Sequence, residues 1–331
     1  MKDLKAHRKE ERAKERVHAT ARNLKEAVET IDKLETELAA VRVLKSHHST
    51  MVIKPKKGTS ASEATAVACL SDVHVGNHFT REQMNGINEY NVHLARERCK
   101  TFFERVVRLT QKERQDVHIE ELVLFLGGDF IDGALHLDTI MSNDVAEPVQ
   151  QVMVAQDIIE SGIKYLEAAG DFSRITLICK DGNHGRFTHK QHYNSRIGNS
   201  LEWYMYYTLA ARYPQFNWVV QQSILTYFKI YEWTIRFHHG DTVHFGGMNG
   251  FYQNLHRKIA GENNATWAHL DVLGHLHQYT PLRQYVVNGS VVGYSPYAET
   301  LQTFNKGESA RQAFFLIDKK RFTTVHIPIL L

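Results

Sequence analysis

Five short clusters of polar residues follow apolar segments along this 331-residue chain, and their side chains are of types that bind metals. They are Asp72-Val73-His74, Gly128-Asp129-Phe130-Ile131-Asp132, Gly182-Asn183-His184, His239-Gly240 and Gly274-His275-Leu276-His277. Carboxylate and imidazole ligands together suit Mn, Fe or Zn, whereas sites made of oxygen ligands alone suit Ca or Mg. Each cluster alone is a weak signal, but five in succession, each after an apolar run, predict one metal centre.

The segments before these clusters have the length and composition of buried strands. Ala66–Leu70, Leu122–Leu126 and Ile175–Cys179 are compact apolar runs that each lead into a polar loop. Between them, Val92–Val107 and Val149–Leu166 place apolar residues at the spacing of amphipathic helices. This alternation predicts a sheet flanked by helices, with the polar clusters at the ends of its strands.

Further strands after Trp218 indicate a second sheet packed on the first. They are Ser223–Ile230, Trp233–His238, Gln284–Val292, Ala313–Ile317 and Phe322–Ile327. The predicted fold class is therefore an α/β sandwich with the metals at the strand-end face.

The composition is that of an ordinary globular protein, with one exception. Hydrophobic residues make up 43% and charged residues 23% of the chain, which excludes a disordered or low-complexity protein. The exception is histidine, with 20 residues, an excess that agrees with metal chemistry. Three cysteines are too few for a disulfide scaffold and favour a reducing compartment. The sequence has no apolar run of about 18 residues and no secretory signal, so we expect a cytoplasmic protein without a membrane span.

The N-terminal segment differs in character from the rest of the chain. Residues 1–46 contain no Pro or Gly and are rich in Ala, Glu, Lys, Arg and Leu, which predicts a long exposed helix. Four apolar residues follow one another at intervals of seven, the repeat of a coiled coil: Val17, Leu24, Ile31 and Leu38. Residues 1–50 are therefore expected to pair with a second copy or with a partner protein, and the alternative is a helix that packs on its own domain.

Residues 51–64 predict a basic flexible linker, because Lys54–Ser62 (KPKKGTSAS) combines positive charge with Pro, Gly and Ser. The domain that follows is predicted to span residues 65–331. Residues 1–60 hold 15 Lys and Arg against 9 Asp and Glu, while the remaining residues hold 25 against 28. The net charge of +3 therefore hides a basic N-terminal segment, which favours nucleic acid as a partner.

The order of the five clusters resembles that of the calcineurin-like metallophosphoesterase superfamily, over residues 65 to about 280. Within it, Ser71-Asp72-Val73-His74-Val75-Gly76 with Phe79 is similar to the S-D-x-H-L-G opening of the SbcD-type DNA repair exonucleases. Gly128–Asp132 fits the second motif of the same group. The resemblance implies a metallophosphoesterase-type four-layer α/β/β/α sandwich, here with a long N-terminal helix, and phosphoester hydrolysis at two divalent metal ions.

The resemblance also implies two sets of ligands that share one carboxylate. One metal would be bound by Asp72, His74, Asp129 and His277, and the other by Asp129, Asn183, His239 and His275. Two divalent ions carry four positive charges and the two carboxylates carry two negative charges. The net charge of the site is therefore positive, which suits an anionic phosphoester. A water shared by the metals, with its pKa lowered, would be the nucleophile. Mn is the preferred metal, with Fe, Zn or Mg as alternatives.

His184 would by resemblance be the general acid for the leaving alkoxide or a donor to a phosphate oxygen, and a proton donor must be held in place. Asp132, the second acid of its motif, would hydrogen-bond His184 and favour its imidazolium form. The alternative for Asp132 is a turn residue that caps the loop before Gly133. Relatives often carry Asp or Glu after this histidine, but Gly185 stands there in this chain.

Residues 186–196 (RFTHKQHYNSR) mix basic and aromatic side chains directly after a metal motif. Charges can follow phosphates and rings can stack on bases, so Arg186, Tyr193 and Arg196 are predicted substrate contacts. His78, in the same loop as His74, is a fourth candidate. The alternative for each is a solvated surface residue.

Three functions are open from the sequence. A Mn-dependent nuclease, acting as an exonuclease or endonuclease in DNA repair, agrees best with the opening motif, the basic N-terminal segment and residues 186–196. A nucleotide or cyclic-nucleotide phosphodiesterase or a phosphatase would use the same metals, but protein phosphatases of this superfamily carry Arg and an acid where Gly133 and Gly185 stand. The third is an inactive core that serves assembly through the N-terminal helix, and the complete ligand set argues against it.

Overall fold

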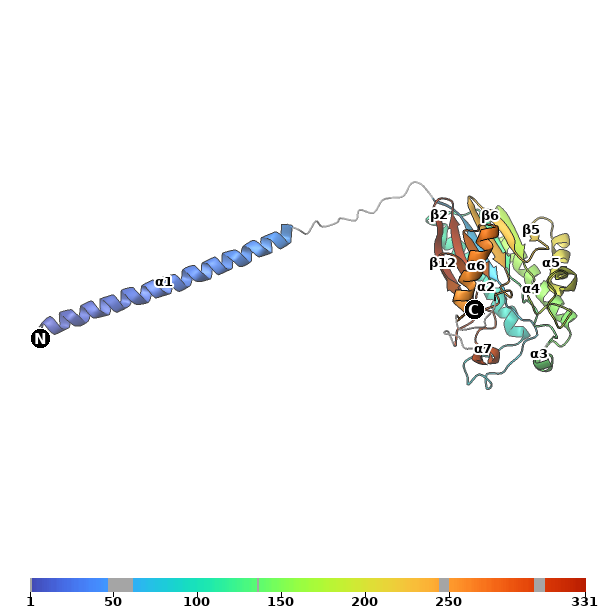
Figure 1. Cartoon of the computed structure of the whole chain (residues 1–331), viewed down its shortest axis with the longest axis horizontal. Coiled ribbons are helices and arrows are strands. Elements are labelled where there is room, and N and C mark those ends of the chain that lie inside the picture. The colour runs from blue at the N-terminus through green and yellow to red at the C-terminus, as the bar shows by residue number, and fades with distance from the viewer. Residues whose placement is uncertain (1, 47–61, 136, 244–249, 301–306) are drawn as a thin grey trace. The chain divides into compact units, whose positions relative to one another are not determined.

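The computed structural model describes residues 2–46, 62–135, 137–243, 250–300 and 307–331 (Figure 1). The chain divides into two compact units, residues 1–59 and residues 60–331. Most of the predicted linker 51–64 lies outside the described residues, and its last three residues belong to the first strand, which begins at Ser62. Among the described residues, no helix combines the length and the hydropathy needed to span a membrane.

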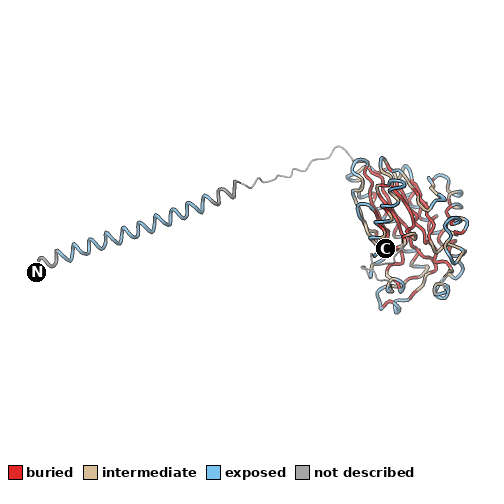
Figure 2. The backbone as a smooth tube through the Cα atoms, in the orientation of Figure 1, coloured by how far each residue is buried: buried red, intermediate tan, exposed pale blue. Residues whose placement is uncertain are grey.

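The first unit contains helix α1 (Lys2–Ser46), as the composition predicts. The described part of this helix is exposed along its length (Figure 2). Its four apolar residues with heptad spacing are exposed: Val17, Leu24, Ile31 and Leu38. Lys14 and Glu10, one turn apart, form an ion pair at 3.2 Å that supports the helix surface. The pairing of α1 with another chain stays a prediction.

The first sheet of the second unit has seven strands in the order β12-β11-β1-β3-β4-β5, with the short β2 paired to β1. They are β1 (Ser62–Leu70), β2 (Val117–His118), β3 (Glu121–Leu126), β4 (Arg174–Cys179), β5 (Asn217–Val220), β11 (Arg311–Asp318) and β12 (Phe322–Leu330). Strands β1, β3, β4 and β5 are parallel, so their carboxyl ends meet at one edge, whereas β11 pairs antiparallel with β1 and β12.

The second sheet has five strands in the order β6-β7-β8-β10-β9. They are β6 (Thr226–Ile230), β7 (Trp233–His238), β8 (Leu270–Leu273), β9 (Thr280–Pro281) and β10 (Tyr285–Val287). Two strands are shorter than the sequence predicts. The strand expected over Ser223–Ile230 starts at Thr226. The strand expected over Gln284–Val292 ends at Val287, because Asn288 leaves the sheet and hydrogen-bonds with β11 of the first sheet.

Helices cover the outer faces of both sheets, which confirms the predicted four layers α/β/β/α (Figure 1). The helices of this unit are α2 (Val92–Glu113), α3 (Leu137–Ser142), α4 (Pro148–Ala169), α5 (Leu201–Arg212), α6 (Gly250–Ala265) and α7 (Pro296–Thr300), with the short 3₁₀ turn η1 (Ile197–Asn199) before α5. Side chains of β1 alternate between two cores, since Ala66 and Ala68 pack with α2, α4 and α5 while Val67 faces the second sheet. On the far side, Leu255 of α6 packs with Val287 of β10.

The loops after β1, β3, β4, β7 and β8 carry the five polar clusters, as the sequence predicts. β7 and β8 are parallel, like β1, β3 and β4, so the clusters leave each sheet at its carboxyl edge. Backbone hydrogen bonds join the loops in pairs. Asp72 N donates to Gly128 O and Gly274 N donates to His239 O, both at 2.9 Å. Between the sheets, His275 N donates to Oδ1 of Asp72 at 3.0 Å, so the two sheets deliver the candidate ligands to one place.

Candidate metal centre

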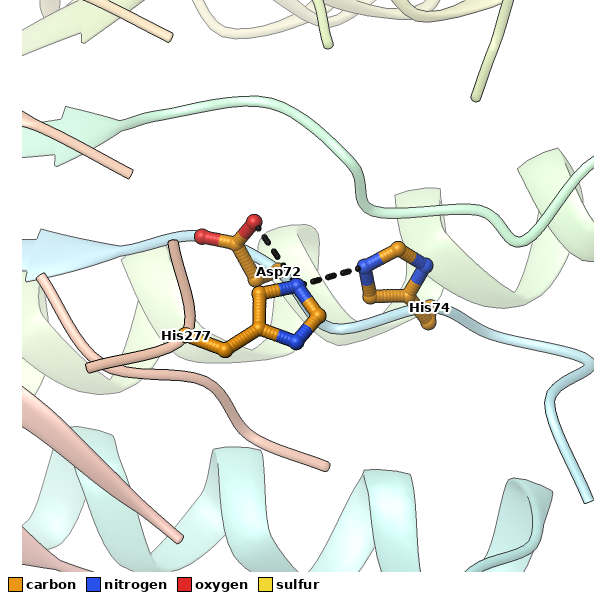
Figure 3. Close-up of side chains that lie close together, drawn as sticks. All are labelled: Asp72, His74 and His277. Atoms are coloured by element: carbon orange, nitrogen blue, oxygen red, sulfur yellow. Dashed lines mark hydrogen bonds and ion pairs between the residues drawn. The ribbon is translucent and has the colours of Figure 1, made fainter. Parts of the chain in front are cut away.

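Asp72, His74 and His277 form a first group of side chains that could hold a metal ion (Figure 3). Nε2 of His277 lies 3.1 Å from Nε2 of His74 and 3.3 Å from Oδ1 of Asp72. Two imidazole nitrogens at this distance repel each other when both are unprotonated, since both present lone pairs. A divalent cation would accept both lone pairs and the carboxylate, so the group fits a metal ion.

Asp129, His239 and His275 form a second group. Nδ1 of His239 donates to the carbonyl oxygen of Gly127 at 2.7 Å, so Nε2 is the nitrogen that gives up its proton when the ring becomes neutral and binds a cation. This Nε2 faces two more acceptors, Oδ2 of Asp129 at 3.0 Å and Oδ1 of Asn183 at 3.1 Å. Three converging acceptors again fit a cation, and they bring the predicted ligand Asn183 into the group.

Asp129 connects the two groups. Its carboxylate also lies close to ring nitrogens of His74 and His184, so it stands between the ligands of the first group and those of the second. The structure thereby brings together all seven residues that the sequence predicts as metal ligands. Their binding of two ions, with Asp129 shared, stays a prediction.

Five of the seven ligand candidates have a left-handed backbone conformation. Their φ angles are +55° for Asp72, +49° for His74, +51° for Asp129, +71° for His275 and +57° for His277. Such a conformation costs a residue other than glycine about 1–3 kcal/mol, and it persists only where the surroundings enforce it. At His74 the neighbouring loop contributes to this, because His74 N donates to Asp129 O at 2.9 Å. Strain of this kind is concentrated at functional sites.

The charges of the metal-free chain favour an ionised carboxylate at the centre. Burial raises the pKa of Asp129, but the charges of His239 and His184 outweigh burial and hold this pKa well below its usual value. Burial lowers the pKa of His239, and the charge of Asp129 more than reverses this and raises it to about 10. Burial and the charge of His239 lower the pKa of His275 to about 4. A cation would replace the proton of His239, whereas His275 is already neutral, as a ligand must be.

Asp132 contacts two histidines, but not through the atoms that the sequence analysis expects. Its Oδ1 lies 3.0 Å from Nδ1 of His74. Nδ1 of His184 lies 2.9 Å from the backbone carbonyl oxygen of Asp132 and 3.8 Å from Oδ1. The expected side-chain hydrogen bond to His184 is therefore corrected to a backbone one. Burial lowers the pKa of His184, and the charges of Asp129 and Asp132 still raise it above its usual value.

Arg196 is a buried structural residue, so its expected contact with substrate is corrected. Its Nε donates to Oδ2 of Asp181 and its Nη1 to Oδ2 of Asp241, both at 2.7 Å. Its Nη2 donates to the carbonyl oxygen of Asp181 at 2.7 Å. Asp181 lies two residues before Asn183 and Asp241 two residues after His239, so Arg196 ties together the two loops that carry these ligands.

Arg186 also binds its own loop. Its guanidinium donates to the carbonyl oxygens of Asn183, Thr188 and His189, the last two at 3.0 and 3.1 Å. These contacts shape the loop, and pairing of Arg186 with a phosphate oxygen stays a prediction.

The other two predicted substrate contacts lie nearer the surface. Tyr193 is 53% exposed, and Phe187 in the same segment is 63% exposed. His78 is half-buried in the loop after β1. Contact of Tyr193 and His78 with substrate stays a prediction.

Two buried polar networks beneath the ligand loops escape the sequence analysis. In one, the side chain of Ser71 donates to the Asp72 carboxylate, and Asn288 donates to Oγ of Ser71 at 2.8 Å. Gln312 completes it by accepting from Ser71 N at 2.9 Å. In the other, Glu202 accepts backbone amides of two ligand loops. The signal in the sequence is a polar residue within an apolar segment, which does not say what it contacts.

No protein-family model matches this sequence, and neither does any curated protein. Several solved structures are similar at low identity. A predicted phosphoesterase from Streptococcus pneumoniae is 11% identical with a TM-score of 0.31, over 80% of this chain and 90% of that one. Vps29 from Entamoeba histolytica in complex with Zn²⁺ is 12% identical with a TM-score of 0.32, over 80% and 99% of the two chains. Vps29 from Cryptosporidium parvum is 10% identical with a TM-score of 0.33, over 81% and 99%. This likeness concerns the fold alone.

Proposed function

We propose that this chain is a metal-dependent phosphodiesterase that hydrolyses nucleic acid, as a DNA exonuclease or endonuclease. The observation that carries the proposal is the pair of ligand groups joined by Asp129. Their mixture of carboxylate and imidazole suits Mn²⁺, with Fe, Zn or Mg as alternatives. His184 stands at the edge of this pair, with its ring centre 4.6 Å from that of His74.

Two divalent ions, when bound, would supply positive charge at an anionic phosphoester and lower the pKa of water. The residues that would hold them are Asp72, His74 and His277 for one ion, Asn183, His239 and His275 for the other, and Asp129 for both. Two carboxylates cannot neutralise two divalent ions, and the imidazole and amide ligands add no negative charge. The protein therefore leaves a net positive site for the substrate.

His184 is the residue proposed to give a proton to the leaving oxygen. Its Nδ1 bonds the carbonyl oxygen of Asp132, so Nε2 is the atom that remains to hold the transferable proton. The charges of Asp129 and Asp132 favour the protonated ring. A positioned acid of this kind contributes about 10²–10⁴-fold to a rate.

Support for nucleic acid comes from residues 186–196. Phe187 and Tyr193 expose their rings, and Lys190 between them is also exposed. Exposed rings and a cation beside a metal centre suit bases that stack and a backbone that carries charge. With Arg186 and Arg196 engaged within the protein, this support rests on the aromatic residues.

The experiment is a substrate panel with Mn²⁺, in which Asp129→Asn is the control variant. The panel holds single- and double-stranded DNA, RNA, cyclic nucleotides, a bis-aryl phosphodiester and an aryl monoester. We expect the wild-type chain to cleave DNA and the bis-aryl diester, and the variant to retain less than about 1% of that rate. Equal background for both proteins would contradict the phosphodiesterase. Preference for a cyclic nucleotide or the monoester over DNA would contradict the nuclease.

Helix α1 is proposed to pair with a second copy of the chain. It is 45 residues long, and its apolar residues with heptad spacing are exposed, from Leu38 at 50% to Val17 at 67%. Pairing along this stripe would bury these side chains, as in a coiled coil.

A further inference from the structure

Glu202 is a fully buried carboxylate in the first turn of α5. Ser200 already caps this helix with its side chain, so the carboxylate of Glu202 bonds groups outside the helix. Its two oxygens accept four backbone N–H groups: Phe130 at 2.5 Å and Ile131 at 3.3 Å on Oε1, and Gly182 at 2.7 Å and Asp129 at 3.2 Å on Oε2. An ionised carboxylate accepts at about four lone-pair positions, so these donors match it fully.

The four amides belong to the two loops that carry Asp129 and Asn183. Gly182 directly precedes Asn183, and Asp129 is itself one of the donors to Glu202. The loops also touch each other, since His184 N donates to Oδ1 of Asp129 at 2.8 Å. A Cβ atom on Gly182 would overlap the Asp129 carboxylate, so the backbones are as close as the chain allows. A shift of Glu202 would therefore move both ligand loops.

Gly185 provides the space that Glu202 occupies. A Cβ atom at this position would lie 2.8 Å from Cγ of Glu202 and 3.2 Å from its carboxyl carbon, both too close for ordinary contact. The chain therefore cannot place a side chain beside His184 at position 185 without displacing Glu202. Glycine at position 185 therefore goes together with the buried Glu202 on α5, because the side chain of Glu202 fills the space that a side chain at position 185 would need.

We propose that Glu202 is a positioning residue of the metal centre, whose carboxylate fixes Asp129 and Asn183 in the arrangement that holds the second ion. The inference rests on the proposed function, from which it takes the metal centre itself. Groups that orient metal ligands without touching the metal change affinity or activity by about 10–100-fold when mutated. The contacts of Glu202 with two ligand loops place it in this class.

The variant Glu202→Gln keeps the size of the side chain and replaces one oxygen with an amide NH₂ group. Whichever way the amide turns, two of the four backbone N–H groups then face a donor instead of an acceptor. Glu160→Gln is the matched control, because Glu160 on α4 bonds Lys164 and Arg212 at the surface. Calorimetric titration of the metal-stripped proteins with Mn²⁺ should show at least about tenfold weaker binding for E202Q and unchanged binding for E160Q. Wild-type affinity in E202Q would overturn the proposal.

Thermal unfolding separates positioning from a general loss of stability. Mn²⁺ should raise the Tm of the wild-type chain more than that of E202Q, whatever the Tm of the metal-free proteins, and an equal rise would count against the proposal. If E202Q does not fold, Glu202→Asp decides, because it keeps the carboxylate group with a shorter reach. Weaker Mn²⁺ binding by folded E202D supports the proposal, and wild-type binding overturns it.

The outcomes for Glu202 and for the proposed function can be told apart. A wild-type chain that binds Mn²⁺ and cleaves no phosphodiester contradicts the proposed function, while weaker Mn²⁺ binding by E202Q still supports the role of Glu202. A wild-type chain that cleaves DNA, together with E202Q of unchanged Mn²⁺ affinity, contradicts the role of Glu202 alone.

Discussion

Oδ1 of Asp132 lies 3.0 Å from Nδ1 of His74, and both side chains are buried. A carboxylate on Nδ1 fixes the tautomer and the orientation of an imidazole whose Nε2 faces a metal, and it makes that nitrogen a better ligand. Among the described residues, Oδ2 of Asp132 has no hydrogen-bond partner, so the contact with His74 is the main use of this carboxylate. Asp132 therefore acts on the first metal group.

Asp132→Asn should weaken the binding of Mn²⁺ by about tenfold or more, because the amide no longer carries the charge that orients His74. Calorimetric titration of metal-stripped protein measures this directly. Asp157→Asn is a matched control, since Asp157 pairs with Arg96 on the surface. Unchanged Mn²⁺ affinity, combined with a slower reaction, would instead favour the original interpretation of Asp132 as a support for His184.

The strand ends could be predicted because a buried parallel strand is a short apolar run that stops where polar residues begin. Leu122–Leu126 shows this pattern, and it differs from β3 by one residue. The convergence of Asp72 with His277, which are 205 positions apart, follows once the strands lie in two packed sheets. The start of β1 could not be predicted, because Ser62 and Glu63 are polar and pair with β2 at the edge of the domain.

The residues that hold the loops could not be predicted, because their roles depend on packing between distant segments. Arg196 resembles a surface cation in a basic segment, yet it contacts Asp241, 45 positions away. Glu202 resembles the acidic residue of an ordinary helix N-terminus, yet it contacts the Asp129 loop, 73 positions before it. Sequence patterns describe the residue and its neighbours along the chain, and here the deciding partner is elsewhere.

His184→Gln should lower the rate of DNA hydrolysis by about 10²–10⁴-fold and leave Mn²⁺ binding nearly unchanged. The loss should be smaller for a bis-aryl phosphodiester, because its aryl leaving group needs less help from an acid. Rates on both substrates and a Mn²⁺ titration test this. His118→Gln, at an exposed position on β2, is the control. Equal losses on the two substrates would show that His184 is not a general acid, and lost Mn²⁺ binding would make it a ligand.

Lys180 predicts a dependence of stability on pH. It is buried, and its Nζ donates to the carbonyl oxygen of Ser223. Burial lowers its pKa to about 8, although the charge of Asp181 opposes this. Between about pH 8 and about pH 10 the unfolded chain keeps a proton that the folded chain has released, so the free energy of unfolding should rise with pH, by up to about 1.4 kcal/mol per unit. Below that window both states carry the proton, and this gain is absent.

Urea unfolding of the wild-type chain and of Lys180→Met across about pH 7 to about pH 10 isolates this contribution. Methionine has nearly the same shape and no proton to exchange. The wild-type free energy of unfolding should gain on that of the variant as the pH rises through the window. Parallel curves for the two proteins would show that the pKa of Lys180 is not lowered by folding.

Removal of residues 1–50 should convert an oligomer into a monomer, so that the mass in solution falls to that of one shortened chain. Phosphodiester turnover should stay unchanged, because the metal ligands all lie in the second unit. Light scattering measures the mass. Leu24→Glu together with Ile31→Glu should have the same effect by placing charges on the heptad stripe, whereas Ala19→Glu, off the stripe, should not. A full-length chain with the mass of a monomer would contradict pairing through α1.

Arg196→Met should lower stability and Tyr193→Ala should weaken substrate binding, although both residues lie in the segment 186–196 that the sequence predicts to bind substrate. Loss of the Arg196 cation leaves the buried carboxylates of Asp181 and Asp241 uncompensated, which should lower the free energy of unfolding by about 3–5 kcal/mol. Tyr193 is exposed, so its removal should change stability by less than about 0.5 kcal/mol. It should instead weaken DNA binding by about 1–3 kcal/mol, the value of one stacked base.

Denaturant unfolding and the KM for single-stranded DNA distinguish the two roles. Arg196→Met should show a lower unfolding midpoint, and where it remains folded, a loss of rate that follows the displacement of the Asn183 and His239 loops. Tyr193→Ala should raise the KM and keep the midpoint. A stable Arg196→Met with a raised KM would show that Arg196 contacts the substrate. Its ion pairs with Asp181 and Asp241 would then have to open when nucleic acid binds.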